Sequence, residues 1–115
     1  MRVLRLRLGR TGWLVLCLVI AAPSWAEFRA CEQVEGQPSP PSAQKVRVVF
    51  INRSEHLRGL YWLDFEGHRK LYTWLKPGQT YDVDSFVGHA WAIVDKRHRC
   101  RRGFVVTGVE EVTID

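Results

Sequence analysis

The sequence lacks a hydrophobic run long enough to cross a membrane. Its longest apolar run, from Trp13 to Ala22, spans about ten of the 115 residues, whereas a membrane-spanning helix needs about 20. Glycine and proline are not enriched, at 9 and 5 residues, which excludes collagen-like and low-complexity chains. With 46% hydrophobic and 25% charged residues, the composition is that of one small globular domain.

Acidic residues are absent from residues 1–26, which carry four arginines ahead of the apolar run. Pro23 ends that run, and Ser24 and Ala26 place small residues at positions −3 and −1 of a cut before Glu27. This three-part order is typical of a secretory signal peptide. A membrane anchor is the alternative, but the run is too short for one. We therefore expect cleavage after residue 26, a secreted or periplasmic protein, and no membrane span in the mature chain.

The excess of positive charge is mostly a property of this N-terminus. Removing its four arginines from the 17 basic residues leaves 17 − 4 = 13, against 12 acidic residues. The mature chain is thus nearly neutral, and we expect no nucleic-acid partner. One basic cluster, Lys96–Arg102, stands out. It is either a solvated hairpin tip or a surface that docks onto anionic polysaccharide, lipid head groups or acidic peptide.

Cysteine is scarce. Of three cysteines, Cys17 lies in the predicted signal peptide, which leaves Cys31 and Cys100 in a mature chain of 115 − 26 = 89 residues. An oxidising compartment and an even count favour a disulfide between them, although two unrelated thiols remain the alternative. Two distant cysteines, and histidines without paired spacing (His56, His68, His89 and His98), give no metal motif, so we expect no metal and no cofactor.

Helical periodicity is missing throughout the mature chain. Residues 27–44 are rich in proline and polar residues, which indicates an extended N-terminal arm that does not pack. From residue 45 to 115 the sequence predicts one all-β domain, a β-sandwich of about seven strands, because short β-branched and aromatic runs alternate with turn residues. The expected strands are Lys45–Ile51, Gly59–Phe65, Lys70–Trp74, Thr80–Val83, Ala90–Val94, Phe104–Val106 and Val109–Ile114.

Several motifs inside this domain occur in a specific order. They are an asparagine turn at the end of Val48–Ser54, the aromatic strand Trp62–Gly67, Tyr72, the Pro-Gly turn in Leu75–Gly78, the block Ser85–Trp91, and Asp95. In this order and spacing, the segment from Val46 to Asp95 resembles the β domain of the von Hippel–Lindau family. A weaker similarity continues from Gly103 through Val106 to the end.

The resemblance implies a seven-stranded β-sandwich that binds a peptide carrying 4-hydroxyproline. It assigns the ligand-binding role to five residues, Trp62, Tyr72, Ser85, His89 and Trp91. The chain departs from the family pattern at Asp84, where the family usually has a histidine that holds the peptide backbone. The family's helical domain, which recruits a ubiquitin ligase, has no counterpart here, so we expect no ubiquitin-ligase partner.

These residue types also suit the chemistry. Flat aromatic faces offer contact area to a puckered apolar ring at low entropic cost. Ser85 and His89, four residues apart across Gly88, can each donate and accept a hydrogen bond, as recognition of one hydroxyl requires. Plain proline would leave both groups unpaired. The sequence therefore predicts an exported, non-enzymatic module that binds a peptide or protein.

Two alternatives remain at this stage. Ser85 and His89 with Asp84 or Asp95 have the composition of a hydrolase triad, but no G-x-S-x-G elbow accompanies them, and we expect no enzyme. The second alternative is an envelope structural or interaction protein. It would dock through the basic tip Lys96–Arg102 or an edge strand, with the aromatic set acting only as packing.

Overall fold

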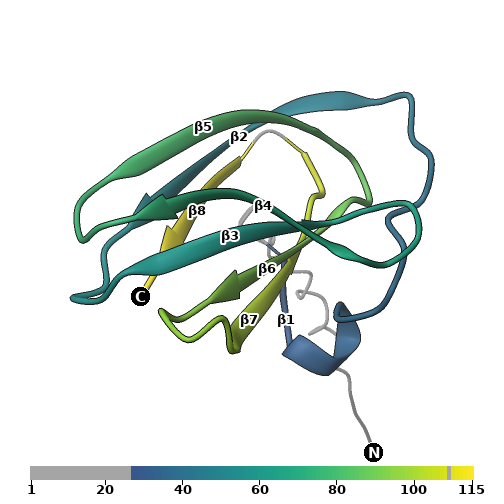
Figure 1. Ribbon diagram of the computed structural model, residues 1–115. Helices are drawn as coiled ribbons and strands as arrows, with labels where there is room; N and C mark the ends of the chain where they lie inside the picture. Colours follow the sequence, from purple (N-terminus) through teal and green to yellow (C-terminus); the bar gives the residue numbers. More distant parts are fainter. Residues whose placement is uncertain (1–26, 109) are drawn as a thin grey trace, which may run out of the picture.

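A computed structural model describes residues 27–108 and 110–115, so the predicted signal peptide and Val109 lie outside the described residues. The described chain forms two β-sheets packed against each other (Figure 1), which confirms the all-β sandwich. The five-stranded sheet has the order β1-β7-β6-β3-β4 and the three-stranded sheet the order β5-β2-β8. The strands are β1 (Glu27–Arg29), β2 (Lys45–Asn52), β3 (Arg58–Leu63), β4 (Arg69–Leu75), β5 (Thr80–Phe86), β6 (Ala90–Val94), β7 (Cys100–Val105) and β8 (Glu110–Ile114).

Alternation of side chains builds the core between the sheets. Along β2, Val46, Val48 and Phe50 are buried while Lys45 and Arg47 are exposed, as expected for a strand with one solvated face. β2 pairs antiparallel with β5 and parallel with β8. The last strand of the described chain, β8, is therefore an edge strand of the three-stranded sheet.

Aromatic rings from both sheets fill the centre. The ring of Phe50 lies 5.2 Å from that of Trp91 and 5.8 Å from that of Phe104. All three residues are at most 1% exposed. A small domain with few core residues gains much of its apolar burial from such large side chains.

The N-terminal arm is packed, contrary to the expectation from its composition. Within residues 27–44, Glu27–Arg29 form β1 on β7, and Cys31–Gln33 form a 3-10 turn, labelled η1. Val34 is buried against the outer face of the five-stranded sheet, together with Leu63 and Val94. Residues 37–44 have no regular secondary structure. β1 accounts for the eighth strand.

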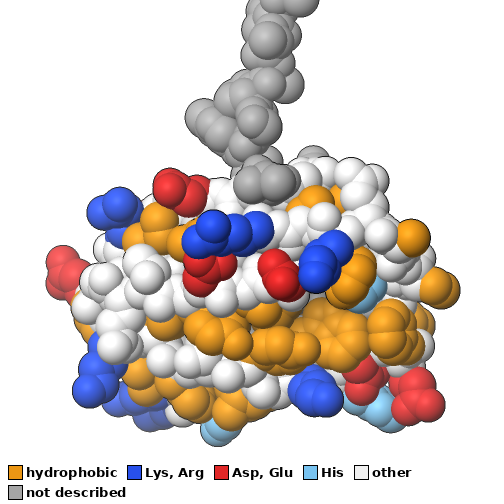
Figure 2. All heavy atoms as spheres, turned by 90° about the horizontal axis from the view of Figure 1, so that it is seen from above, with side chains coloured by type: hydrophobic (Ala, Val, Ile, Leu, Met, Phe, Trp, Pro, Cys, Tyr) orange, Lys and Arg blue, Asp and Glu red, His pale blue; other side chains and the backbone are white. Residues whose placement is uncertain are grey.

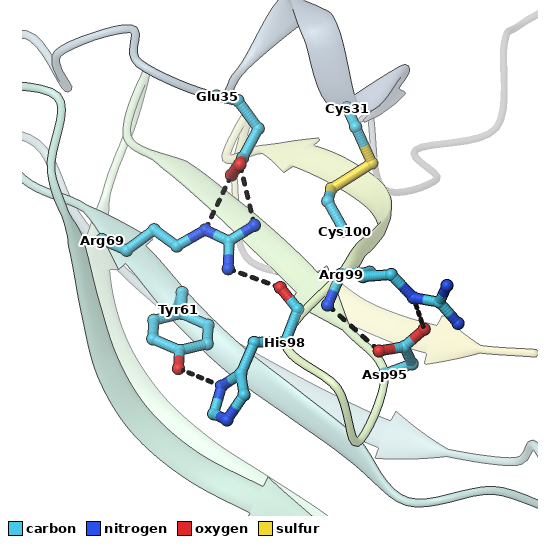
Figure 3. A network of polar contacts seen from close by, with 8 residues as sticks. All are labelled: Cys31, Glu35, Tyr61, Arg69, Asp95, His98, Arg99 and Cys100. Carbon is cyan, nitrogen blue, oxygen red and sulfur yellow. Dashed lines mark hydrogen bonds and ion pairs between the residues drawn. A yellow bond between two sulfur atoms is a disulfide. The ribbon is translucent and has the colours of Figure 1, made fainter.

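Cys31 and Cys100 form a disulfide that joins this arm to the start of β7, as predicted (Figure 3). Arg69 adds a second link, since its guanidinium donates two hydrogen bonds to the Glu35 carboxylate, at 2.8 and 3.0 Å. The arm is thus held to the five-stranded sheet by a covalent bond and an ion pair. Across residues 27–108 and 110–115, no helix has the length and apolar character of a membrane span.

Candidate functional site

The five residues predicted to bind ligand lie around one hollow of about 220 Å³. Each comes from a different part of the fold: Trp62 from β3, Tyr72 from β4, Ser85 from β5, His89 from the turn after β5, and Trp91 from β6. Pairing of β3 with β6 places Trp62 opposite Trp91. We call this site the aromatic hollow. Three further residues line it, namely Phe65, Asp84 and Phe86.

Trp91 forms the floor of the aromatic hollow. Its side chain is 1% exposed and belongs to the core between the sheets, so its packing and site roles coincide. Its indole Nε1 donates a hydrogen bond of 3.1 Å to Ser85 Oγ. Ser85 is buried, and this bond fixes the position of its hydroxyl oxygen.

The walls are aromatic. Tyr72 packs edge-on against Trp91, with ring centroids 4.9 Å apart, and lies 6.3 Å from Trp62. Phe65 stands edge-on to Trp62 at 5.2 Å and is 59% exposed. Burial is the main cause that raises the pKa of the Tyr72 phenol, with a smaller contribution from Tyr81. The phenol therefore remains protonated, and a potential donor, at neutral pH.

Large exposed hydrophobic side chains continue beyond the hollow. Leu71 and Tyr72, both on β4, are 45% and 40% exposed. Figure 2, which views the side of the molecule where β5 lies, shows a continuous band of hydrophobic side chains bordered by charged ones. A band of this kind on a small domain is typical of an interaction surface.

His89 is enclosed by rings. Its imidazole stacks on Trp62 with centroids 5.6 Å apart and an interplanar angle of 29°, and it also contacts Phe65 and Phe86 at 5.6 and 5.2 Å. Burial lowers the pKa of His89, outweighing a hydrogen bond to the Pro40 carbonyl that acts in the opposite direction. The imidazole is therefore neutral at pH 7.

The arm holds this histidine in place. Ser39 is buried, and its Oγ accepts a hydrogen bond of 3.0 Å from the backbone N–H of Ala90 and donates to the Leu63 carbonyl. Gly88 has φ +91°, and a Cβ there would lie 3.2 Å from Pro40 Cγ. Glycine is needed at this turn because other residues disfavour that φ and would press on the arm.

Two buried nitrogens of the hollow have no hydrogen-bond partner within the part of the chain that the structure describes. They are Nε2 of His89 and Nε1 of Trp62. Buried polar groups are nearly always paired, so such an atom calls for an explanation. In a hollow open to solvent, a ligand that supplies the partner is one.

Ser85, His89 and an aspartate do not form the hydrogen-bonded triad of a hydrolase in the described chain. Ser85 Oγ is bonded to Trp91, and no hydrogen bond joins it to His89 among the described residues. Asp84 faces Lys45, with 3.8 Å between carboxylate and ammonium. Asp95 belongs to the turn between β6 and β7, beyond the opposite end of β6 from His89. The geometry gives no support to acid–base activation of Ser85.

Sequence reasoning missed Phe65 and Phe86 as lining residues. Phe65 belongs to the motif Trp62–Gly67, and its aromatic side chain at the end of the expected strand Gly59–Phe65 was the available signal, although the observed strand β3 ends at Leu63. Phe86 precedes the turn that carries His89, and nothing in its spacing distinguished it from a core residue.

The geometry agrees with the comparison to known families. The model of the VHL beta domain matches residues 37–108, a range that includes the whole aromatic hollow and the part of the arm that positions His89. Proteins of this family use the β domain for recognition. The chain belongs to the VHL beta domain family.

Proposed function

We propose that this protein is an exported recognition module that binds a peptide carrying 4-hydroxyproline in the aromatic hollow, without catalysis. The observation that carries the proposal is the buried Nε2 of His89, which has no partner in the described chain and lies among aromatic rings. A neutral, unpaired nitrogen in an apolar hollow selects for a ligand that brings a hydroxyl to it.

The hydrogen-bonding roles follow from the neighbours. The Pro40 carbonyl accepts a hydrogen bond from the His89 ring. In a neutral imidazole the other nitrogen, here Nε2, is then an acceptor. Ser85 Oγ accepts from Trp91, so its own proton remains available. A ligand hydroxyl can donate to His89 and accept from Ser85, which satisfies both groups.

The size and walls suit a proline ring. A hollow of about 220 Å³ is smaller than the roughly 300–1,000 Å³ of pockets that take whole drug-sized ligands, and it fits one side chain of a longer ligand. The rings of Trp62, Tyr72 and Trp91 provide flat faces for the ring C–H groups. Unmodified proline would fill the same space but leave His89 and Ser85 without a partner.

The residues on either side of the hydroxyproline can bind along two edge strands beside the hollow. β4 and β5 are the outer strands of their sheets and both contribute to the hollow. Edge strands offer unpaired backbone groups to an extended peptide. The exposed side chains of Leu71 and Phe65 add apolar contact beside them.

The test is titration with a blocked Ala-Ala-hydroxyproline-Ala-Ala peptide and its proline twin, followed by calorimetry and by NMR of the tryptophan indoles. We expect the hydroxylated peptide to bind about a hundredfold tighter, since two buried groups lose their partner with proline. The indole N–H signals of Trp62 and Trp91 should shift on binding. Equal affinity for the two peptides, or binding by neither, would overturn the proposal.

Matched variants locate the site. Ser85→Ala and His89→Phe should each remove most of the preference for the hydroxylated peptide, because each deletes one partner of the hydroxyl. His68→Phe serves as the control, since His68 has a side chain 75% exposed outside the hollow. If the control lowers affinity as much as His89→Phe, the hollow is not the binding site.

A further inference from the structure

A second hollow lies at the other end of the sandwich from the aromatic one. It measures about 620 Å³ and lies between the turn from β2 to β3 and the turn from β6 to β7. Five cationic side chains line it against two carboxylates: Arg58, Lys96, Arg97, Arg99 and Arg101 against Glu55 and Asp95. We call it the basic groove.

Arg58 is the unusual member of this set. It is 7% exposed, yet no ion pair reaches it within residues 27–108 and 110–115. Its one side-chain hydrogen bond there runs 3.3 Å from Nη1 to the carbonyl of Leu57. A buried guanidinium has five N–H donors and is normally paired, because leaving the charge uncompensated is costly. Arg58 is therefore a cation without an ion-pair partner in the described chain, and its remaining guanidinium N–H groups open onto solvent.

Among the described residues, the carboxylates of the basic groove do not pair with Arg58, and neither does Asp115, which lines a smaller neighbouring hollow together with Arg58. Asp95 is occupied by its own turn, where Oδ1 accepts from the backbone N–H of Arg97 at 2.8 Å and from that of Arg99 at 3.0 Å, and Figure 3 shows the second of these bonds. Its second oxygen pairs with the Arg99 side chain at 3.3 Å. Glu55 makes no ion pair among the described residues and is exposed. Arg97 and Arg101 remain uncompensated at the rim.

Both walls of the basic groove are fixed. Asn52, fully buried, donates through Nδ2 to the carbonyls of His56 and Leu75, at 2.8 and 2.9 Å, which holds the turn after β2. On the other wall, the His98 carbonyl accepts from Arg69 at 2.7 Å (Figure 3). The groove is thus a preformed site, which reduces the entropic cost of binding.

The surrounding backbone disfavours a peptide ligand here. β3 is paired with β4 from Arg58 on and with β6 from Gly59 on, and β7 is paired with β6, and with β1 at residues 103–105. Little strand edge is therefore left beside the groove for an extended chain to join. The available groups are guanidinium forks, whose geometry matches the oxygens of phosphate and sulfate.

We propose that the basic groove binds a compact ligand bearing two or more phosphate or sulfate groups, with Arg58 contacting one group and Arg97 and Arg101 a second. The volume exceeds what a single ion fills, and the cations are spread across it. The ligand restores charge balance to Arg58. This site is separate from the aromatic hollow and does not depend on the function proposed for it.

The experiment is calorimetric titration of the protein with inositol hexakisphosphate, sucrose octasulfate and inorganic phosphate, at equal ionic strength. We expect at least one of the first two to bind tenfold or more tighter than inorganic phosphate, because it engages several cations at once. The stronger of the two identifies phosphate or sulfate as the preferred group. Equally weak binding of all three probes would overturn the proposal.

Variants separate recognition from general attraction. Arg97→Gln with Arg101→Gln should weaken the stronger probe at least fivefold, and Arg58→Gln at least tenfold. Lys70→Gln with Lys76→Gln removes the same charge from exposed residues outside the groove, and should change affinity less than twofold. If this control matches the rim pair, or if the rim pair has no effect, the site is refuted; this comparison stands even if Arg58→Gln fails to fold.

Discussion

The two ends of this sandwich are built from the same strands but present opposite chemistry. Trp62 and Arg58 lie four residues apart on one face of β3, about 13 Å along the strand. At one end, neutral rings surround an unpaired acceptor, His89 Nε2. At the other, a buried cation faces a rim of further cations. A single strand thus joins the site proposed to bind a hydroxyl to the site proposed to bind anionic groups.

Because of this difference, we expect the two ends to respond differently to salt concentration and to pH. Attraction between exposed charges is screened within about 8–10 Å at physiological salt, so the rim of the basic groove is sensitive to ionic strength. Hydrogen bonds to neutral groups inside an apolar hollow are little affected by salt. Proton uptake reverses the pattern, because His89, whose pKa is lowered by burial, gains a charge on acidification, whereas arginine stays charged throughout.

The largest expected effect comes from removing the disulfide, which acts on both ends through the arm. Cys31 and Cys100 are 69 residues apart, and closing a loop of that length stabilises a fold by about 4 kcal/mol in the chain-entropy model. Cys31→Ala with Cys100→Ala should lower the melting temperature by roughly 15–30 °C. Thermal unfolding with and without reductant measures it. A shift below about 5 °C would mean that the arm is held by other contacts.

Asn52→Ala should disrupt the basic groove and leave the aromatic hollow intact. The side chain is buried, and both its nitrogen and its oxygen are hydrogen-bonded, to the carbonyls of His56 and Leu75 and to Ser54. Leaving such partners unsatisfied costs about 1–3 kcal/mol each. We expect a loss of about 3 kcal/mol in denaturant unfolding and weaker binding of hexakisphosphate or octasulfate. Equal damage to peptide binding would show that the two ends are coupled.

Acid should weaken the aromatic end selectively. The pKa of His89 is lowered by burial, so the neutral form is favoured in the fold. The stability that this contributes is fully present above the unfolded pKa of about 6.5 and is lost as pH falls through the folded value. Protonated His89 also cannot accept the ligand hydroxyl. Peptide affinity should therefore fall as the pH drops through the lowered pKa of His89, and hexakisphosphate affinity should not fall with it.

His89→Phe provides the control for the pH series. With no titrating ring in the hollow, the remaining weak peptide affinity should be flat between pH 5 and 7.5. A fall of the same size in this variant would assign the pH dependence to another group.

The smallest expected effect concerns the rim of the aromatic hollow. Asp84 lies beside the hollow where the family usually has a histidine, and its pair with Lys45 is exposed on both sides. An exposed ion pair contributes little, so Asp84 remains available to a cationic ligand residue. A peptide with arginine next to hydroxyproline should bind about two- to fivefold tighter than its alanine counterpart, and Asp84→Asn should abolish that gain. A gain that survives in Asp84→Asn would place the cation elsewhere.

The strands could be predicted from the sequence because each depends on a short run of β-branched and aromatic residues between turn residues. All seven expected strands occur, with shifts of a few residues at their ends; β7, for example, begins at Cys100 rather than at Phe104. The packing of the N-terminal arm could not be predicted in this way. Its polar and proline-rich composition indicates a free segment, but Val34 and Ser39 find their partners on β3 and β6, far away in the chain.

The two sites also differ in how far they could be predicted from the sequence. The five residues of the aromatic hollow could be predicted from an ordered set of motifs, and the structure brings all of them together. The unpaired state of His89 Nε2 could not, since it depends on the carbonyl of Pro40 in the arm. Arg58 reads as an ordinary basic residue at the start of a strand. Only the packing of the sheets reveals that its side chain is largely buried and has no ion-pair partner among the described residues.

The parallel pairing of β8 with β2 has a consequence for how the protein is made. Val48 pairs with Glu110 and Asn52 with Ile114, so β2 lacks one neighbour until nearly all of the described chain has been synthesised. Such distant contacts form slowly and leave an unpaired edge exposed in the meantime. Completion of the fold must therefore wait until residue 114 has left the ribosome, so the three-stranded sheet is assembled only after synthesis has passed β8.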